Sequence, residues 1–183
     1  MTQKLVKIGH LILRAKTRDL TIREAVSPRV KNFTARMVKT MRHAQGVGLA
    51  ANQVGDPRRI LVMECRGNSR YPNRPSFPLQ TYFNARIVGR SKKTIHDWEG
   101  CLSIPGYRGR VPRAQSVTFE ALTLEGKKVR RTVRGFEARV LQHEVDHLDG
   151  KFYVDRMKRS GDLYHLEEFE KELGIKVPRE KKR

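Results

Sequence analysis

The first long segment with a helical pattern of apolar residues runs from about residue 28 to residue 45. Its apolar stripe consists of Val30, Phe33, Met37, Met41 and Ala44. This recurrence every three or four residues predicts a helix with one buried face. Ser27 and Pro28 suit the N-cap and the first helical position, and we expect Gly46 to end the helix.

A second helix is predicted between Gly135 and Gly150. Its buried face carries Phe136, Val140, His143 and His147. Gly135 suits a break before this helix, and Gly150 suits a left-handed cap after it. A third, shorter helix is predicted from about residue 162 to 173, with Gly174 as its end.

Extended segments lie between these helices. Strands are predicted near 59–64, 83–89, 115–124 and 127–133. The last two flank Glu125-Gly126 and alternate in polarity, which predicts a hairpin. Residues 66–80 are polar and rich in proline, as surface loops are.

The order of these elements indicates the α+β class, with antiparallel sheets packed around a central helix at 135–150. A chain of 183 residues suits a single catalytic domain spanning residues 1–183. Within it we expect an N-terminal strand and loop in residues 1–25. Residues 160–183 are expected to form a C-terminal helix and a basic tail.

The chemistry of the second helix is carried by His143-Glu144-x-x-His147. Two histidines four positions apart share a helix face, so both can reach one metal ion. Glu144 is then placed to take a proton from a water that the metal activates. An exposed helix with chance histidines is the plain alternative. Burying so much polarity without partners would cost several kcal/mol, which favours the metal site.

A catalytic site of this kind needs a third protein ligand. Cys101, in Glu99-Gly100-Cys101-Leu102-Ser103, is the best candidate, because a thiolate and two imidazoles leave one position open for water. Cys65 lies in an apolar, strand-like run and is interpreted as a core residue. A Cys65–Cys101 disulfide is the alternative, but two cysteines without a secretion signal favour reduced thiols.

A loop of small residues, Gly46-Val47-Gly48-Leu49-Ala50-Ala51-Asn52-Gln53, follows the first helix. Taken alone it fits an ordinary turn. Gly48 would let a substrate backbone approach closely, and Gln53 offers an amide donor that could polarise a carbonyl.

These three blocks, at 46–53, 99–103 and 142–150, resemble the pattern of the peptide deformylase family. The family pattern is Gly-x-Gly-x-Ala-Ala-x-Gln, then Glu-Gly-Cys-Leu-Ser, then Gln-His-Glu-x-Asp-His-Leu-x-Gly, and all three blocks are intact. The resemblance extends from near the N-terminus to residue 157. It implies hydrolytic removal of the formyl group from the N-terminal methionine of new polypeptides.

The resemblance also implies residue roles. Cys101, His143 and His147 would bind the metal. Glu144 would take the water proton and pass it to the leaving amine. The side chain of Gln53 and the backbone N–H of Leu102 would stabilise the oxyanion.

Substrate contacts are implied for Val47, Gly48, Arg108, Phe136 and Val140. The first two would align the peptide backbone, and the last two would wall a pocket for the methionine side chain. For Arg108, a solvated loop cation is an equal alternative to a substrate contact.

Supporting residues can be proposed around the ligands. Glu99 and Arg113 resemble an ion pair of the family that braces the cysteine loop. Asp146 could orient a ligand imidazole, or it could face solvent. Trp98 could border the pocket, although simple packing explains it as well.

The residues do not identify the metal. Sulfur and imidazole ligands accept zinc, iron, cobalt or nickel. The resemblance implies one divalent ion, natively iron(II).

The charge is unusual, because 39 Lys and Arg face only 19 Asp and Glu, a net charge of +20. Such an excess attracts polyanions. We therefore expect ribosomal RNA as a second partner, in addition to the N-formylmethionyl nascent peptides. Candidate contacts are the tail at 176–183 and the basic run at 127–131; a generally solubilising surface is the alternative. No apolar run is long enough to span a membrane. We expect a cytoplasmic monomer, with organelle targeting as a minor alternative.

Two other functions fit parts of the pattern. A zinc endopeptidase shares the His-Glu-x-x-His string but has no need of the cysteine block. A basic RNA-binding protein could keep the metal for stability alone.

Overall fold

The computed structural model describes residues 1–67 and 74–174. Its helices are α1 (Ile22–Ala25), α2 (Pro28–His43), α3 (Gly135–Leu148) and α4 (Leu166–Leu173). Its strands are β1 (Gly48–Ala50), β2 (Ile60–Cys65), β3 (Phe77–Arg90), β4 (Thr94–Cys101), β5 (Ile104–Ala114), β6 (Ser116–Leu122), β7 (Lys128–Arg134) and β8 (Leu163–His165). Short 3-10 turns η1 (Leu11–Leu13), η2 (Ala51–Val54), η3 (Tyr153–Arg156) and η4 (Ser160–Asp162) connect them.

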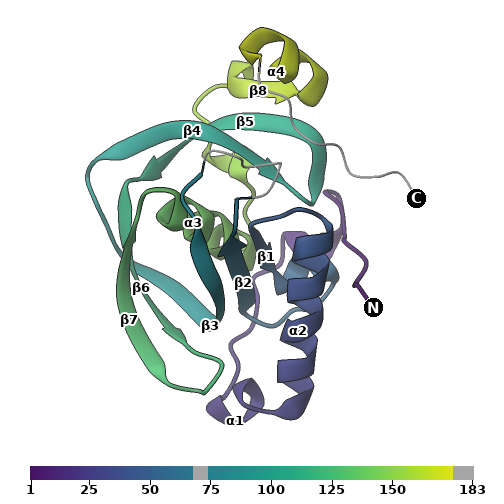
Figure 1. The fold of residues 1–183 in the computed structure, drawn as a ribbon, viewed down its shortest axis with the longest axis vertical. Coiled ribbons are helices and arrows are strands. Elements are labelled where there is room, and N and C mark those ends of the chain that lie inside the picture. The colour runs from purple at the N-terminus through teal and green to yellow at the C-terminus, as the bar shows by residue number, and fades with distance from the viewer. Residues whose placement is uncertain (68–73, 175–183) are drawn as a thin grey trace.

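The strands form two antiparallel sheets. One has five strands in the order β1-β2-β3-β6-β7, and the other has three in the order β4-β5-β8. Helix α3 packs against strands of both sheets (Figure 1), and every residue from Ala138 to Leu148 is buried. The predicted α+β fold with a central helix is therefore confirmed.

Two apolar clusters hold the helices in place. Leu141, Val145 and Leu148 of α3 pack with residues of the five-stranded sheet such as Leu61 and Phe119. The second cluster lies on the other side of that sheet and contains the apolar face of α2. Its buried members include Val30, Phe33, Met37 and Met41, as the sequence predicted.

The C-terminus of α2 differs in detail from the prediction. The helix ends at His43, and Gln45 rather than a glycine takes the left-handed conformation, with φ 52°. The N–H of Gly46 donates to the carbonyl of Met41 at 2.9 Å, and that of Gln45 donates to Arg42 at 3.1 Å. These two bonds form a Schellman cap. Gly46 is needed for packing rather than for the cap, because a Cβ at this position would lie 3.0 Å from the side chain of Leu102.

The hairpin of β6 and β7 is confirmed around Glu125-Gly126, with Gly126 at φ 78°. The predicted caps Gly150 and Gly174 are also left-handed, at φ 72° and φ 63°. Helix α4 begins at Leu166, later than predicted, because the residues before it form η4 and β8. Strand β3 begins at Phe77, inside the predicted loop, where the backbone pairs with Cys65 of β2 and the ring is buried.

The prediction of a strand within residues 1–25 was wrong. This segment contains η1, α1 and only an isolated bridge from Arg18 to Arg58. Gly9, at φ 101°, turns the chain, and His10 then caps η1. The basic tail at 176–183 lies outside the described residues.

Candidate metal centre

Helix α3 is fixed against β5 by one side-chain amide, which bonds the backbone of β5 as a neighbouring strand would. The amide of Gln142 accepts from the backbone N–H of Ala114 at 3.1 Å and donates to the Ala114 carbonyl at 3.0 Å. The next residues, His143 and Glu144, and His147 one turn later, are thereby aimed toward the end of β4.

Cys101 is the last residue of β4, at an irregularity in its pairing with β5. Gly100 makes this approach possible, since a Cβ there would overlap the guanidinium of Arg108 at 1.8 Å. The β4–β5 hairpin thus brings a thiol from one sheet to the imidazoles of the central helix.

The three predicted ligands converge. The Nε2 atom of His147 lies 3.1 Å from Sγ of Cys101 and 3.2 Å from Nε2 of His143. All three donor atoms lie within 4.8 Å of one another, and all three residues are buried. Ligands of a tetrahedral ion bound at ~2.0–2.3 Å stand ~3.3–3.6 Å apart, so this donor set fits a single divalent metal.

The thiol is electrostatically prepared for such a role. Burial alone would raise the pKa of Cys101, but the imidazoles of His147 and His143 lower it well below its ordinary value. The thiolate is the form that binds metals.

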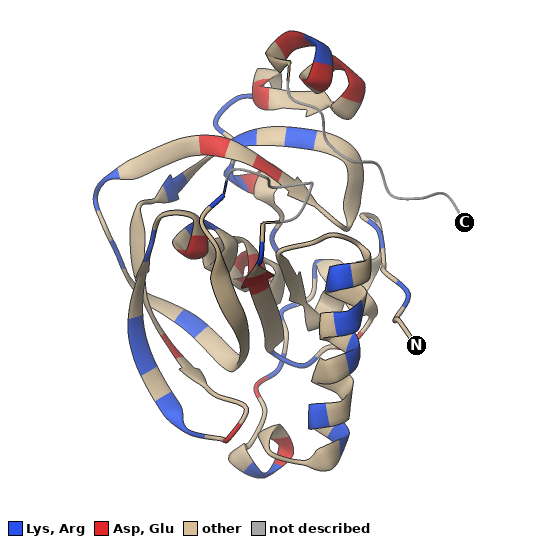
Figure 2. Cartoon of the chain, in the orientation of Figure 1, with Lys and Arg blue, Asp and Glu red and all other residues tan. Residues whose placement is uncertain are grey.

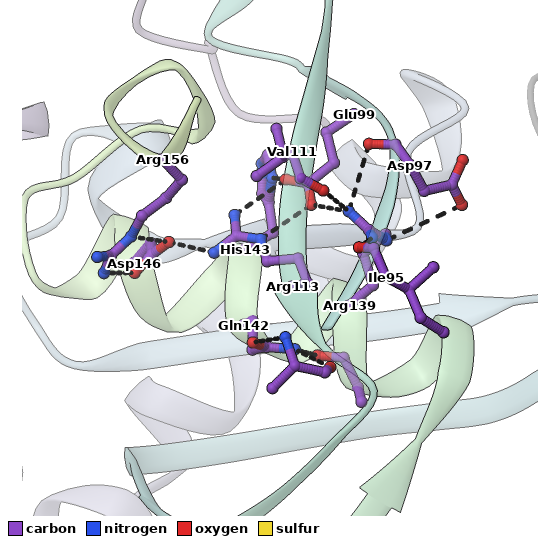
Figure 3. A network of polar contacts seen from close by, with 12 residues as sticks. Ile95, Asp97, Glu99, Val111, Arg113, Arg139, Gln142, His143, Asp146 and Arg156 are labelled. Atoms are coloured by element: carbon purple, nitrogen blue, oxygen red, sulfur yellow. Dashed lines mark hydrogen bonds and ion pairs between the residues drawn. The ribbon is translucent and has the colours of Figure 1, made fainter. Parts of the chain in front are cut away.

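Glu99 fixes the orientation of His143 (Figure 3). Its carboxylate accepts from Nδ1 of His143 at 2.8 Å, from Nε of Arg113 at 2.9 Å and from Nη1 of Arg139 at 2.7 Å. Burial would raise the pKa of Glu99, but Arg113 and His143 hold it well below its usual range. The proposed Glu99–Arg113 pair is confirmed, and Arg139 completes it.

Asp146 has neither of the two roles considered for it. Its side chain is buried, and it accepts from Arg156 at 2.6 Å and from Arg113 on its other side, not from an imidazole (Figure 3). Burial opposes ionisation, but Arg156 and Arg113 keep the pKa of Asp146 below its ordinary value. Asp146 therefore anchors Arg113, which in turn holds Glu99.

Glu144 lies beside the ligands with its Oε2 atom buried and without a hydrogen-bond partner among the described residues. Burial raises the pKa of Glu144 to about 7. Gly48 faces it closely, because a Cβ at that position would lie 2.3 Å from Oε1 of Glu144. A carboxyl group with this pKa and a free oxygen can exchange protons near neutral pH.

A cleft opens over the ligands. Its lining includes Cys101, His143 and Glu144 together with Val47, Gly48, Gln53, Leu102, Phe136 and Val140. Trp98 also lines it, while its ring packs edge-on against Tyr164 and Phe169. The sequence-predicted residues of the cleft are thus brought together, apart from Arg108.

Arg108 does not line this cleft, and it is 4% exposed. The alternative of a solvated loop cation was therefore wrong. The guanidinium packs against Gly100, behind the cysteine.

Gln53 is held at the metal ligands by three contacts. Its Oε1 accepts from the N–H of Ala50 at 2.8 Å, which directs Nε2 toward Sγ of Cys101 at 3.5 Å and Oγ of Ser103 at 3.3 Å. Cys65 is buried and unbridged, as predicted.

The sequence analysis missed three supporting residues: Arg156, which holds Asp146, and Arg139 and Tyr153. Arg139 lies one turn before His143, and that spacing was a usable signal. The ring of Tyr153 stacks on His143 with centroids 6.2 Å apart, because η3 folds back on α3, and helical spacing does not reveal this contact.

Comparison with known proteins gives a consistent result. The family described as polypeptide deformylase matches residues 2–162. Peptide deformylase 2 of Nostoc sp. is 34% identical over 172 residues, which cover 91% of this chain and 92% of that protein. Peptide deformylase of Leptospira biflexa is 40% identical over 157 residues, covering 85% and 88%.

The fold gives the same answer. A peptide deformylase of Acinetobacter baumannii, solved with Met-Ala-Ser bound, aligns with a TM-score of 0.83 and 36% identity, covering 86% of this chain and 99% of that one. Over residues 1–67 and 74–174, no helix has the length and apolar character needed to cross a membrane. The chain belongs to the polypeptide deformylase family, hydrolases that remove the N-terminal formyl group from new polypeptides.

Proposed function

We propose that this chain releases formate from N-formylmethionyl polypeptides, with Cys101, His143 and His147 holding one divalent ion. The observation that carries the proposal is the convergence of these three donors within 4.8 Å beside the unpartnered oxygen of Glu144. When bound, the ion supplies Lewis acidity, which polarises the formyl carbonyl and lowers the pKa of a water molecule.

Protein residues then do the proton transfer and charge stabilisation. Glu144 accepts the proton of the attacking water and returns it to the leaving amine nitrogen. The side-chain N–H of Gln53 and the backbone N–H of Leu102 donate to the developing oxyanion, and one such donor is worth ~3 kcal/mol.

The cleft would bind the substrate as follows. Phe136 and Val140 flank the methionine side chain, while Val47 and Gly48 align the peptide backbone. The Acinetobacter baumannii relative with Met-Ala-Ser bound supports a peptide ligand of this kind. Arg108 would contribute from behind the cysteine hairpin by supporting Gly100, where the two are in contact.

We propose iron(II) as the native ion, with zinc, nickel and cobalt as substitutes. Thiolate-bound iron(II) is sensitive to oxygen, so activity should fall in air and return with nickel or cobalt. Full activity with zinc and none with iron would contradict this choice. We also propose that the enzyme is a cytoplasmic monomer that reaches the ribosome through its positive surface.

Formate release from formyl-Met-Ala-Ser by wild type and Glu144→Gln tests the catalytic proposal. The variant should keep its metal and lose about 100- to 10,000-fold in kcat. An internal, blocked peptide serves as the control substrate and should not be cleaved. Turnover by Glu144→Gln at the wild-type rate would remove Glu144 from the mechanism.

A further inference from the structure

The outer face of α2 carries charges of one sign only. Its exposed cations are Arg29, Lys31, Arg36, Lys39 and Arg42, and the helix contains no Asp or Glu. Figure 2 shows them as blue segments that recur along α2, with no red segment among them. A helix of 16 residues is ~24 Å long, and the cations from Arg29 to Arg42 are spread over nearly all of it.

Most of these cations have no acidic partner. Arg42 is paired with Glu64 at 2.8 Å. The other four, Arg29, Lys31, Arg36 and Lys39, form no ion pair with any residue in the described ranges, and we call them the basic ridge. The pKa of Glu125 is lowered by hydrogen bonds at Thr123 and its own backbone, then by the charge of Lys127, and only slightly by Lys31. The ridge therefore presents uncompensated positive charge.

The apolar side of the same helix is already used. Val30, Phe33, Met37 and Met41 are buried in the protein core. A helix that binds in a membrane surface must insert its apolar face, and α2 has none to offer. The ridge can act only through charge, and its complement is a regular array of negative groups.

We propose that the basic ridge docks on the phosphate backbone of double-stranded RNA. The major groove of an RNA helix is deep and narrow and excludes side chains, so such proteins contact phosphates and sugars rather than base edges. Arg29, Arg36 and Lys39, spaced by seven and then three positions, lie along one side of the helix and suit this contact, because it requires charge along a line and no base recognition.

The position of the ridge gives the contact a use. Helix α2 ends at His43, and Gly46 and Val47, just beyond, line the cleft over the metal ligands. RNA held along α2 would therefore have the cleft at one end of its binding surface. The docking itself rests on the charge pattern, whereas this presentation of nascent chains to the cleft rests on the proposed function.

The test is the binding of a fluorescein-labelled RNA hairpin, followed by anisotropy, to the metal-loaded full chain. Four phosphate contacts predict a loss of affinity on the order of 100-fold between 50 and 200 mM salt. The triple change Arg29→Glu, Arg36→Glu and Lys39→Glu should weaken binding at 50 mM by more than 100-fold. The neutral triple to Gln, which keeps good helix formers, should reduce the slope of log affinity against log salt by about 3.

The matched control reverses three exposed cations elsewhere, Arg90, Lys92 and Lys93, around the turn from β3 to β4 on the other side of the molecule (Figure 2). It changes the net charge equally and should lower affinity less than fivefold. Equal losses in both triples would overturn the proposal in favour of bulk charge.

Vesicle binding and formate release are measured on the same proteins. Binding to phosphatidylserine vesicles without binding to the RNA would also overturn the proposal. Formate release from formyl-Met-Ala-Ser should be unchanged in both triples, so the enzymatic function and the docking can fail independently.

Discussion

Glu99 accepts a hydrogen bond from Nδ1 of His143 at 2.8 Å, and the same carboxylate is held by Arg113 and Arg139. Because Nδ1 carries the proton, the lone pair of Nε2 is directed toward Cys101 and His147. A buried ion-pair network centred on Glu99 of β4 thus sets the tautomer of His143, a candidate metal ligand on α3.

Replacing this acceptor should therefore weaken metal binding. In Glu99→Gln, the amide can still meet His143 but no longer neutralises the two arginines, and we expect a 10- to 100-fold loss of metal affinity. Competition with a chelator measures it. Glu120→Gln, an exposed partner of Arg130 on β6, is the control, and equal affinity in both variants would show that Glu99 does not orient the ligand.

The contact between Gly48 and Glu144 predicts an activity defect without loss of metal. A methyl group at Gly48 would lie 2.3 Å from Oε1, so the carboxylate of Glu144 must move. Since proton transfer depends on its position, kcat of Gly48→Ala should fall by about 100-fold or more.

The matched control is Gly161→Ala, because a Cβ there meets nothing within 4 Å. It should keep wild-type kcat. Normal kcat in Gly48→Ala would mean that the carboxylate needs no fixed position.

Stability should depend on pH through Asp146. Its pKa is lowered in the folded protein by Arg156 and Arg113, despite burial. At low pH the carboxyl of Asp146 binds more protons in the unfolded chain than in the folded chain. Its contribution to the free energy of unfolding is therefore complete well above the unfolded pKa of about 4 and is lost as the pH falls through the folded pKa.

Urea unfolding at pH 7 and pH 3 measures this. Asp146→Asn should be about 1–3 kcal/mol less stable at pH 7 and should lose less on acidification than wild type. Identical pH dependence in wild type and variant would contradict the role given to Asp146.

Part of this site follows from sequence because it is local. Helical spacing alone puts His143 and His147 on one face, and the cysteine block supplies Cys101. Helix α3 nevertheless exceeds its prediction: the pattern indicated one buried face, but the polar Arg139 and Asp146 are buried as well, because both have charged partners.

The β4–β5 hairpin shows where local patterns fail. Strand β5 contains two prolines and two glycines, which usually indicate a loop. One of them, Gly109, is required by packing, because a Cβ there would lie 2.6 Å from the ring of Tyr153. Pairing with β4 and β8 determines this segment, and those contacts come from distant parts of the chain.

The most direct measurement of the central claim is the extended X-ray absorption fine structure (EXAFS) of the bound metal in the loaded protein. We predict one sulfur at ~2.3 Å and two imidazole nitrogens at ~2.0–2.1 Å per chain, with the sulfur lost in Cys101→Ser. A shell without sulfur in the wild type, or one that Cys101→Ser leaves unchanged, would contradict the account.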